Sequence, residues 1–211
     1  MFKRNFFFIV FEGIEGTGKS FQINKLVNNL KKININTLKT REPGGSITAE
    51  KIRKLIFSKE GKKFDKLTDY YLMLAARNEH IKKTILKAKK KKLIIISDRF
   101  IDSTYAYQVV GNNIEPKLDK INHKYILNGI KPDLTIVLKS SFKSIFLRLK
   151  KRKNKNKYDK LKINFYNKVQ NAFLKKARLN RMKYVIFNSS NNDNMLEKKI
   201  LKLILNKIKY D

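Results

Sequence analysis

The sequence contains no cysteine and only two histidines, His80 and His123, among its 211 residues. A chain without thiols has no disulfide scaffold, no cysteine-ligated zinc ion and no thiol nucleophile. Two histidines are too few for a histidine-based metal centre, and they offer no serine–histidine pairing of the kind that hydrolases use. These absences exclude thiol-based and histidine-based classes of chemistry.

Long apolar runs are also missing, because no stretch approaches the roughly 20 apolar residues that a membrane span requires. Lys3 and Arg4 precede the apolar residues 6–11, as in a secretory signal, but Glu12 ends that run early and no small-residue cleavage site follows. We therefore interpret residues 6–11 as a buried strand. We expect a soluble, cytoplasmic protein with no membrane partner.

Acidic residues are scarce: 17 aspartates and glutamates stand against 50 lysines and arginines, a formal net charge of +33. Lysine is spread over the whole chain beside many asparagines and isoleucines. This spread favours compositional drift of the encoding genome over a selected polyanion surface, because a selected patch would cluster on one element. With 42% apolar residues the chain can bury one core, so we expect a single domain over residues 1–211.

Hydrophobic periodicity predicts alternating strands and helices. Short runs rich in β-branched and aromatic residues predict strands at residues 6–11, 35–38, 93–97, 134–138 and 184–187. Longer amphipathic stretches predict helices at residues 19–31, 48–57, 67–90, 116–130, 142–151, 161–181 and 195–208. We therefore expect an α/β fold with a five-stranded parallel sheet flanked by helices. The basic residues 150–160 have almost no apolar content, which predicts a mobile, solvated loop.

A phosphate-binding motif follows the first predicted strand. The pattern GxxxxGK[ST] is complete and opens a predicted helix, which is the context of a P-loop. Its glycines let successive backbone N–H groups point at a polyphosphate, and the helix N-terminus adds partial positive charge. We expect Lys19 to reach the β- and γ-phosphates of ATP and the Ser20 hydroxyl to bind Mg²⁺. The candidate phosphate-binding residues are Gly13, Ile14, Glu15, Gly16, Thr17, Gly18, Lys19 and Ser20.

An acidic residue and an arginine, Asp98 and Arg99, end the predicted strand that contains three consecutive isoleucines. Open α/β sheets bind their ligands at the carboxyl ends of the strands. Asp98 is placed like the strand-end acid that helps to hold Mg²⁺ in P-loop enzymes. The predicted metal ligands are therefore Ser20 and Asp98.

Four blocks of sequence, in this order, resemble thymidylate kinases. They are FEGIEGTGKS at residues 11–20, TREPGG at 40–45, LMLAAR at 72–77 and DRFIDSTYAYQ at 98–108. A P-loop alone is common to many NTPases, whereas the second and fourth blocks together are specific to this family. The resemblance implies a P-loop NTPase fold with a short basic lid and the reaction ATP + dTMP → ADP + dTDP for dTTP supply. It also implies a homodimer, for which we expect the helices near residues 48–57, 67–90 and 142–151.

The resemblance further implies roles at the acceptor. Arg41 and Arg99 match the family arginines that contact the phosphate of dTMP, and Arg77 matches the arginine that reads thymine. Arginine only donates and thymine O4 only accepts, whereas cytosine presents an amino group there, so this arginine favours thymine or uracil. Tyr107 matches the ring that lies against deoxyribose and leaves no room for a 2′-hydroxyl. The other implied base-site residues are Ser103, Thr104, Gln108 and Met73, the last standing where the family usually has an aromatic ring.

The basic segment at residues 148–160 resembles the family lid. The P-loop has Thr17 where one class of thymidylate kinases has an arginine, so the chain resembles the class that supplies lid arginines to ATP. Arg152 is the candidate catalytic lid residue beside Lys19 and Arg99, and Arg148 is the second candidate. The family's Arg-x-Glu pattern is reduced here to KYD at 157–159. Diffuse support is expected from Lys150, Lys151, Lys153, Lys155 and Lys157.

Two other functions remain open at this level. One is a P-loop kinase for another nucleoside or nucleotide. The other is an NTPase stimulated by nucleic acid, which the charge of +33 suggests. Single-strand binding calls for aromatic residues interleaved with basic ones, and the basic segment has only Tyr158. We therefore favour ATP and dTMP as partners, with no specific nucleic acid.

Overall fold

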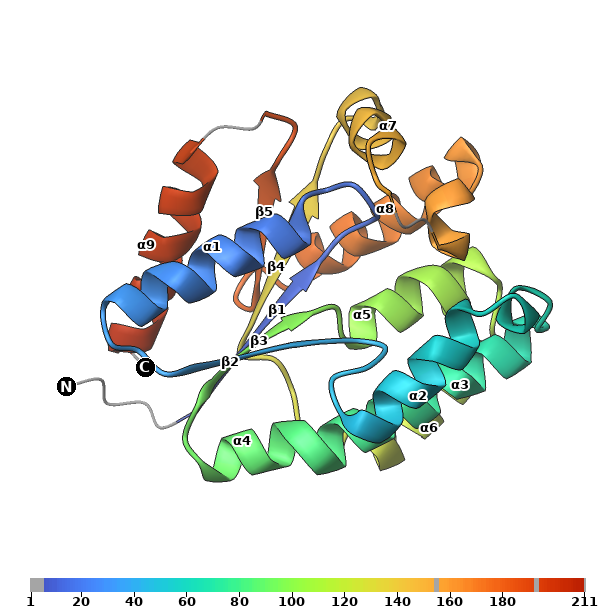
Figure 1. The fold of residues 1–211 in the computed structure, drawn as a ribbon, viewed down its shortest axis with the longest axis horizontal. Coiled ribbons are helices and arrows are strands. Elements are labelled where there is room, and N and C mark those ends of the chain that lie inside the picture. The colour runs from blue at the N-terminus through green and yellow to red at the C-terminus, as the bar shows by residue number, and fades with distance from the viewer. Residues whose placement is uncertain (1–5, 154–155, 192–193, 211) are drawn as a thin grey trace.

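The computed structural model describes residues 6–153, 156–191 and 194–210. Its centre is a sheet of five parallel strands in the order β2-β3-β1-β4-β5, with helices on both faces (Figure 1). The strands are β1 (Phe7–Glu12), β2 (Thr37–Arg41), β3 (Ile94–Asp98), β4 (Leu134–Lys139) and β5 (Tyr184–Asn188). Five strands form as predicted, although β2 begins two residues later than the predicted range 35–38 and extends to Arg41. The α/β fold is confirmed.

The helices follow most of the predicted ranges. Within the described residues the α-helices are α1 (Lys19–Lys32), α2 (Ile47–Phe57), α3 (Lys66–His80), α4 (Leu86–Lys90), α5 (Ile101–Thr104), α6 (Pro116–Ile126), α7 (Phe142–Lys150), α8 (Ile163–Leu179) and α9 (Asn194–Tyr210). The shorter elements are η1 (Glu60–Lys62), η2 (Ile81–Ile85), η3 (Tyr105–Gly111) and η4 (Lys157–Lys160). The π-helical η2 joins α3 to α4, so the long helix predicted at 67–90 is confirmed as one continuous segment.

Two helical predictions need correction. The helix predicted at 116–130 ends at Ile126, because Asn128 and Gly129 have positive φ angles of 46° and 74°. No helix is predicted over residues 101–111, where α5 and η3 form. Ala106 and Tyr107 pack into the cluster beneath α8, and this tertiary contact stabilises a helix that has no clear local pattern.

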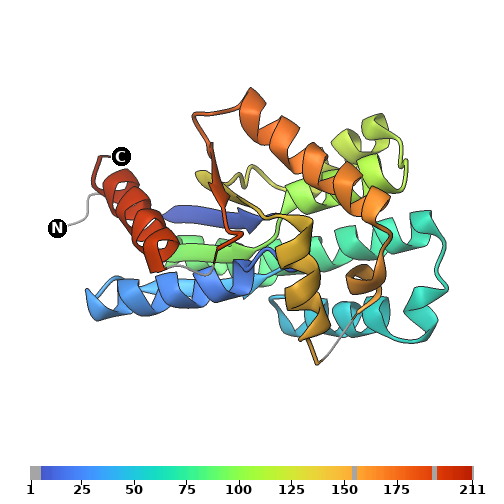
Figure 2. The ribbon, with the colours of Figure 1, turned by 90° about the horizontal axis from the view of Figure 1, so that it is seen from above.

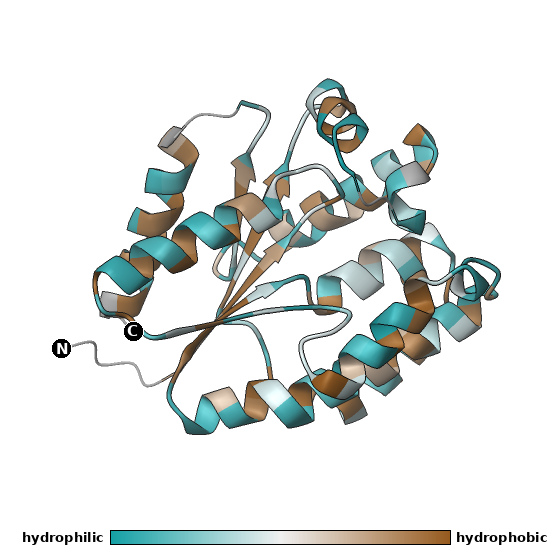
Figure 3. Ribbon diagram, in the orientation of Figure 1, coloured by the Kyte–Doolittle hydropathy of each residue, from teal (hydrophilic) through white to brown (hydrophobic). Residues whose placement is uncertain are grey.

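The two faces of the sheet pack against different helices. In β1, Phe7, Ile9 and Phe11 point toward α1 and α9, whereas Phe8 and Val10 point toward η2 and α4. Figure 2 shows α1 and α8 on opposite sides of the sheet, and Figure 3 shows apolar strands between helices with polar outer faces. Burial on both faces explains why the strands read as continuous apolar runs.

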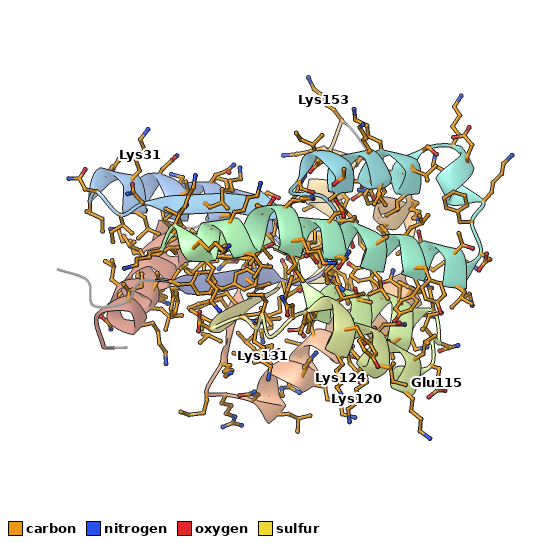
Figure 4. All side chains as sticks on the ribbon, turned by 90° about the horizontal axis from the view of Figure 1, so that it is seen from below. Lys31, Glu115, Lys120, Lys124, Lys131 and Lys153 are labelled. Carbon is orange, nitrogen blue, oxygen red and sulfur yellow. The ribbon has the colours of Figure 1, made fainter. Side chains whose placement is uncertain are left out.

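The lysines on the surface extend from several elements. Figure 4 labels Lys31 on α1, Lys120 and Lys124 on α6, Lys131 before β4 and Lys153 after α7, all exposed. This spread supports the compositional interpretation of the charge of +33. None of the helices described is both long enough and apolar enough to cross a membrane.

The η4 segment contradicts the prediction of a solvated loop. The ring of Tyr158 packs edge-on against the rings of Tyr107 and Phe57, with ring centres 5.3 Å and 6.0 Å apart. The Tyr158 hydroxyl donates to Asp69 Oδ2 at 2.9 Å. Tyr158, together with the ion pair between Lys157 and Asp69, therefore docks a segment whose composition is otherwise almost entirely polar. Lys155, one of the predicted lid bases, lies outside the described residues.

The carboxyl ends of β1, β2 and β3 meet at one edge of the sheet. The register pairs Asp98 with Phe11 on one side and with Arg41 on the other. The segments that follow these strands are the P-loop, the TREPGG turn and α5. Because the strands are parallel, these three segments lie next to one another at the same edge of the sheet.

Candidate active site

A cavity of about 930 Å³ opens at this edge of the sheet. It is lined by the P-loop, the turn after β2, α3, α5, η3, the end of α7 and the η4 segment. All the candidate catalytic, metal and acceptor residues line this one cavity: Lys19, Ser20, Arg41, Met73, Arg77, Asp98, Arg99, Ser103, Thr104, Tyr107, Gln108 and Arg152. Of the P-loop residues, Gly13, Ile14 and Thr17 do not line it.

The P-loop backbone depends on glycine at its first position. Gly13 has a φ of 134°, and a Cβ there would lie 2.4 Å from the carbonyl oxygen of Leu138. Thr17 Oγ1 donates to the carbonyl oxygen of Ile14 at 2.8 Å and ties the loop across its turn. The N-cap of α1 is Gly18, which has no side-chain cap, so the first N–H groups of the helix are available to an anion.

Lys19 is buried at the base of the cavity. Its Nζ donates to the carbonyl oxygens of Gly13 at 2.9 Å and Ile14 at 3.0 Å. Burial, followed by the charge of Arg99, lowers the pKa of Lys19 to about 8, while Asp98 acts in the opposite direction. Lys19 is therefore cationic at neutral pH, and a bound polyphosphate would favour that state further.

Ser20 and Asp98 are in direct contact. Ser20 Oγ donates to Asp98 Oδ2 at 2.8 Å, and a hydroxyl and a carboxylate are the oxygen ligands that Mg²⁺ prefers. The described residues include no group of three or more His, Cys, Asp or Glu placed to hold a metal ion. The donor set therefore fits a Mg²⁺ ion that shares its ligands with a nucleotide.

Arg99 is held from several sides in a left-handed backbone conformation, with a φ of 75°. Its Nη2 donates to Glu15 Oε1 at 2.7 Å and its Nη1 to Ser103 Oγ at 2.9 Å. The guanidinium lies 5.1 Å from the ring centre of Tyr107, whose hydroxyl donates to the other oxygen of Glu15. Burial alone would lower the pKa of Arg99, but Tyr107 and Glu15 raise it above its ordinary value. The site therefore holds a permanent, oriented cation at the end of β3.

Arg77 lies deep on the α3 side of the cavity, with 3% of its surface exposed. Its Nη1 donates to Thr104 Oγ1 at 2.8 Å and its Nη2 to the carbonyl oxygen of Phe100 at 3.0 Å. The Thr104 hydroxyl, predicted to stand near the base, is thus hydrogen-bonded to this arginine. Met73, one turn earlier on α3, lines the same part of the cavity.

Two arginines stand beside the turn after β2. Arg41 is exposed and pairs with Glu50 on α2, with Nη2 and Oε2 2.8 Å apart. Arg53 donates to the carbonyl oxygen of Pro43 at 2.7 Å and lies 4.7 Å above the ring of Phe57. No carboxylate among the described residues forms an ion pair with Arg53. Burial, followed by the charge of Arg41, lowers the pKa of Arg53 to about 10, so it lines the cavity as a cation.

The two lid arginines have different partners. Arg152 Nη1 lies 2.7 Å from Oδ1 of Asp159 in η4. Arg148 reaches the P-loop itself: its Nη1 donates to the carbonyl oxygen of Gly16 at 3.0 Å and its Nη2 to that of Ser189 at 2.6 Å. The second candidate from the sequence is thus the one in contact with the phosphate-binding loop.

Comparison with known proteins places this geometry in a family. The family model of thymidylate kinases matches residues 11–200. The chain belongs to the thymidylate kinase family. The match includes the P-loop, the TREPGG turn, the α3 arginine and the lid, so the resemblance predicted from four sequence blocks is confirmed.

Individual thymidylate kinases agree over most of the chain. The thymidylate kinase of Mycoplasma capricolum is 36% identical over 96% of this chain and 96% of its own. That of Wolbachia pipientis wMel is 42% identical over 79% of this chain and 82% of its own. The crystal structure of thymidylate kinase from Ehrlichia chaffeensis has a TM-score of 0.77 at 30% identity, covering 94% of this chain and 98% of the other. The predicted P-loop NTPase fold is thereby confirmed.

Glu12 takes part in this thymidylate kinase site in a way that the motif does not indicate. Its carboxylate is fully buried and accepts from the backbone N–H of Phe100 at 2.8 Å and from the hydroxyl of Ser103 at 2.6 Å. It therefore caps the start of α5 and supports the turn that carries Arg99. The sequence feature that could have indicated this role is an acidic residue at the end of an apolar strand, directly before an anion-binding loop.

The sequence predicts Glu15 only as a member of the phosphate-binding loop, and it assigns no role to Arg53. A carboxylate inside a phosphate-binding loop needs a cation beside it, and Glu15 finds one in Arg99. That requirement is a usable sequence signal. Arg53 offered no such signal. In a lysine-rich chain a helical arginine cannot be distinguished by sequence from exposed basic residues, and only the packing of α2 places it in the cavity.

We predict that Glu12→Gln removes a pH-dependent part of the stability. Burial, followed by the charge of Asp102, raises the pKa of Glu12 from 4.5 to about 7. A folded-state pKa above the unfolded value gives stability that is complete below pH 4.5 and is lost as the pH rises through about 7. The advantage of wild type over the variant in unfolding free energy should therefore shrink by about 2 to 3 kcal/mol between pH 5 and pH 8.

Urea unfolding at a series of pH values measures this difference. Glu115→Gln, the same substitution at an exposed position, serves as the control and should give a profile parallel to wild type. Parallel profiles for Glu12→Gln and wild type would contradict the prediction.

Proposed function

We propose that this cavity binds ATP at the P-loop and dTMP between α3 and α5, and transfers the γ-phosphoryl group to give ADP and dTDP on the route to dTTP. The chain is a phosphotransferase of the thymidylate kinase family. One observation carries the assignment of the site: the P-loop lysine, the arginine after β3 and the α3 arginine line the same cavity. We further propose that residues 1–211 form one domain with a lid at about 148–160.

The chemistry requires alignment and positive charge rather than a base. The phosphate of dTMP has a second pKa of about 6, so it is already an anionic nucleophile at neutral pH. One of its oxygens attacks the γ-phosphorus, and the bond from that phosphorus to the β,γ-bridging oxygen breaks, leaving ADP. Two polyanions must be held together for this step, and Lys19, Arg99 and Arg152 are the proposed sources of positive charge. Mg²⁺, held by Ser20 and Asp98, would neutralise further charge on the phosphates.

The acceptor site divides into three parts. We assign the phosphate of dTMP to Arg41, Arg53 and Arg99, of which Arg53 has no carboxylate partner among the described residues. We assign thymine to the α3 side, with Arg77 at O4 and Met73 over the ring. The remaining predicted base-site groups are Ser103, Thr104 and Gln108.

We assign the deoxyribose to Tyr107, whose ring is fixed by Glu15 and by the η4 tyrosine. Tyr107→Ala should therefore open space beside C2′ and raise turnover of UMP relative to dUMP by about tenfold, since the exclusion is steric. Steady-state kinetics with both nucleotides measures the ratio. Tyr107→Phe keeps the ring and should keep the wild-type ratio, whereas an unchanged ratio in a folded Tyr107→Ala would place the sugar elsewhere.

A coupled assay of ADP release with a panel of nucleoside monophosphates tests the proposed activity. We expect dTMP to be preferred over dCMP, AMP and GMP. Preference for any of these three would favour the alternative of a kinase for another nucleotide. Strong stimulation of ATP hydrolysis by DNA would favour the nucleic-acid alternative, although weak nonspecific binding to DNA is expected from the charge alone.

We also propose a cytoplasmic homodimer with no specific nucleic acid or membrane partner. The neighbouring helices α2 and α3 expose the apolar side chains Leu55, Leu67 and Tyr71 at 44%, 44% and 46% of their surface. This apolar surface supports an interface on the helices expected from the sequence. Sedimentation equilibrium should give twice the chain mass, and a monomer at micromolar concentration would reject the homodimer.

A further inference from the structure

A network of buried polar side chains contacts Arg77, the α3 arginine. Glu42, in the TREPGG turn, has 4% of its surface exposed, and its two oxygens accept from two residues one turn apart on α3. Arg77 Nε donates to Oε2 at 2.7 Å, and Nδ1 of His80 donates to Oε1 at 2.9 Å. Burial alone would raise the pKa of Glu42, but the charge of Arg77 and the hydrogen bond from His80 hold it below its ordinary value. The carboxylate is therefore a fixed anion that aligns one edge of the guanidinium.

His123 holds the opposite side of the same guanidinium. Its Nε2 lies 2.7 Å from Arg77 Nη1, and arginine only donates, so this nitrogen must be the acceptor. The proton of the neutral ring then sits on Nδ1, which faces Asp119 Oδ1 at 3.2 Å. His123 comes from α6 and does not line the cavity. A histidine outside the cavity thus accepts one of the Arg77 N–H groups.

The guanidinium has five N–H groups in a fixed plane. Glu42, Thr104, His123 and the carbonyl oxygen of Phe100 take four of them, from three segments of the chain: the turn after β2, α5 with its N-cap, and α6. These four hydrogen bonds together fix the guanidinium of Arg77 in one orientation. A loss of any one acceptor frees it to rotate, or leaves a buried N–H without a partner.

We propose that His123 and Glu42 are positioning residues for base recognition: they hold Arg77 in the orientation that reads thymine O4. The inference rests on the proposed function of Arg77. Part of the base specificity then comes from residues that contact Arg77 and not the base itself. Discrimination between dTMP and dCMP depends on a hydrogen-bond acceptor on α6.

The test compares His123→Phe, which keeps a ring but has no acceptor, with His123→Gln, which offers an amide oxygen. For His123→Phe we expect KM for dTMP to rise about tenfold, while kcat stays within about twofold, because base binding contributes equally to the ground and transition states. KM for ATP should not change, and the preference for dTMP over dCMP should shrink. His123→Gln should return KM for dTMP to within about threefold of wild type. If His123→Phe does not fold, His123→Met replaces it, since its flexible side chain fills irregular space.

The matched control is Asn122→Ala on the same helix, which removes a hydrogen bond to the Tyr70 hydroxyl and does not touch Arg77. It should leave both KM values unchanged. Equal KM values for dTMP in wild type, His123→Phe and His123→Gln would overturn the inference, and so would equal losses in the two His123 variants or a defect shared with ATP. Failure of the wild-type enzyme to phosphorylate dTMP would instead reject the proposed function, before any variant is compared.

Discussion

Lys19→Ala should reduce kcat by on the order of a thousandfold or more while the protein stays folded. The Nζ of Lys19 is the cation that the P-loop holds at the base of the cavity, and the proposed transfer places the reacting phosphates there. Alanine favours the first turn of α1, and the sheet core does not include this side chain. The loss is therefore one of charge at the transferring group, not of packing.

Single-turnover kinetics with dTMP, together with thermal unfolding, measures this result. Lys25→Ala is the matched control, because Lys25 lies on the same helix and pairs with Glu197 at the surface; it should keep wild-type kcat. A folded Lys19→Ala enzyme with wild-type kcat and ATP affinity would show that the motif does not carry the transfer step.

Arg77→Met should produce two separate losses. The first is kinetic: kcat/KM for dTMP should fall about ten- to a hundredfold and discrimination against dCMP should shrink, because the charged donor to O4 is gone. The second is structural: Glu42 would remain buried without its cation, and breaking a buried ion pair from one side costs about 3 to 5 kcal/mol. The sequence alone suggests only a helix arginine in reach of a base, for which no such loss of stability follows.

A double variant separates the two losses. Glu42→Gln in the Arg77→Met background removes the unpaired charge, so it should recover much of the unfolding free energy and none of the dTMP specificity. Urea unfolding and the dTMP:dCMP ratio of kcat/KM are the two measurements. Arg178→Met, at an exposed position of α8, is the control and should change neither. Recovery of specificity together with stability would mean that Arg77 only supports the fold and does not read the base.

The arginines of the site differ in how well their positions can be predicted from the sequence. Arg99 was predicted from its place after a buried strand, and the structure puts it at the carboxyl end of β3 as expected. Arg41 was predicted from the resemblance to thymidylate kinases. It lines the cavity but is exposed and paired with Glu50, and the unpredicted Arg53 stands beside it with no ion pair among the described residues. Strand ends are marked by local pattern, whereas the direction of a helical side chain depends on how the helix packs.

The sequence by itself determined the order of the strands along the chain, most of the helices and the P-loop, which follow from hydrophobic periodicity and from glycine backbone geometry. The rule that parallel strands present their carboxyl ends at one edge placed Asp98 and Arg99 there, and the resemblance to thymidylate kinases supplied the acceptor-site side chains. Only the tertiary structure decided which of those side chains are free and which are held. Arg77 and Glu42 are 35 positions apart, and Tyr158 and Asp69 are 89 apart. No local pattern records such pairs, because hydrogen bonds between distant residues form only after the helices have packed on the sheet.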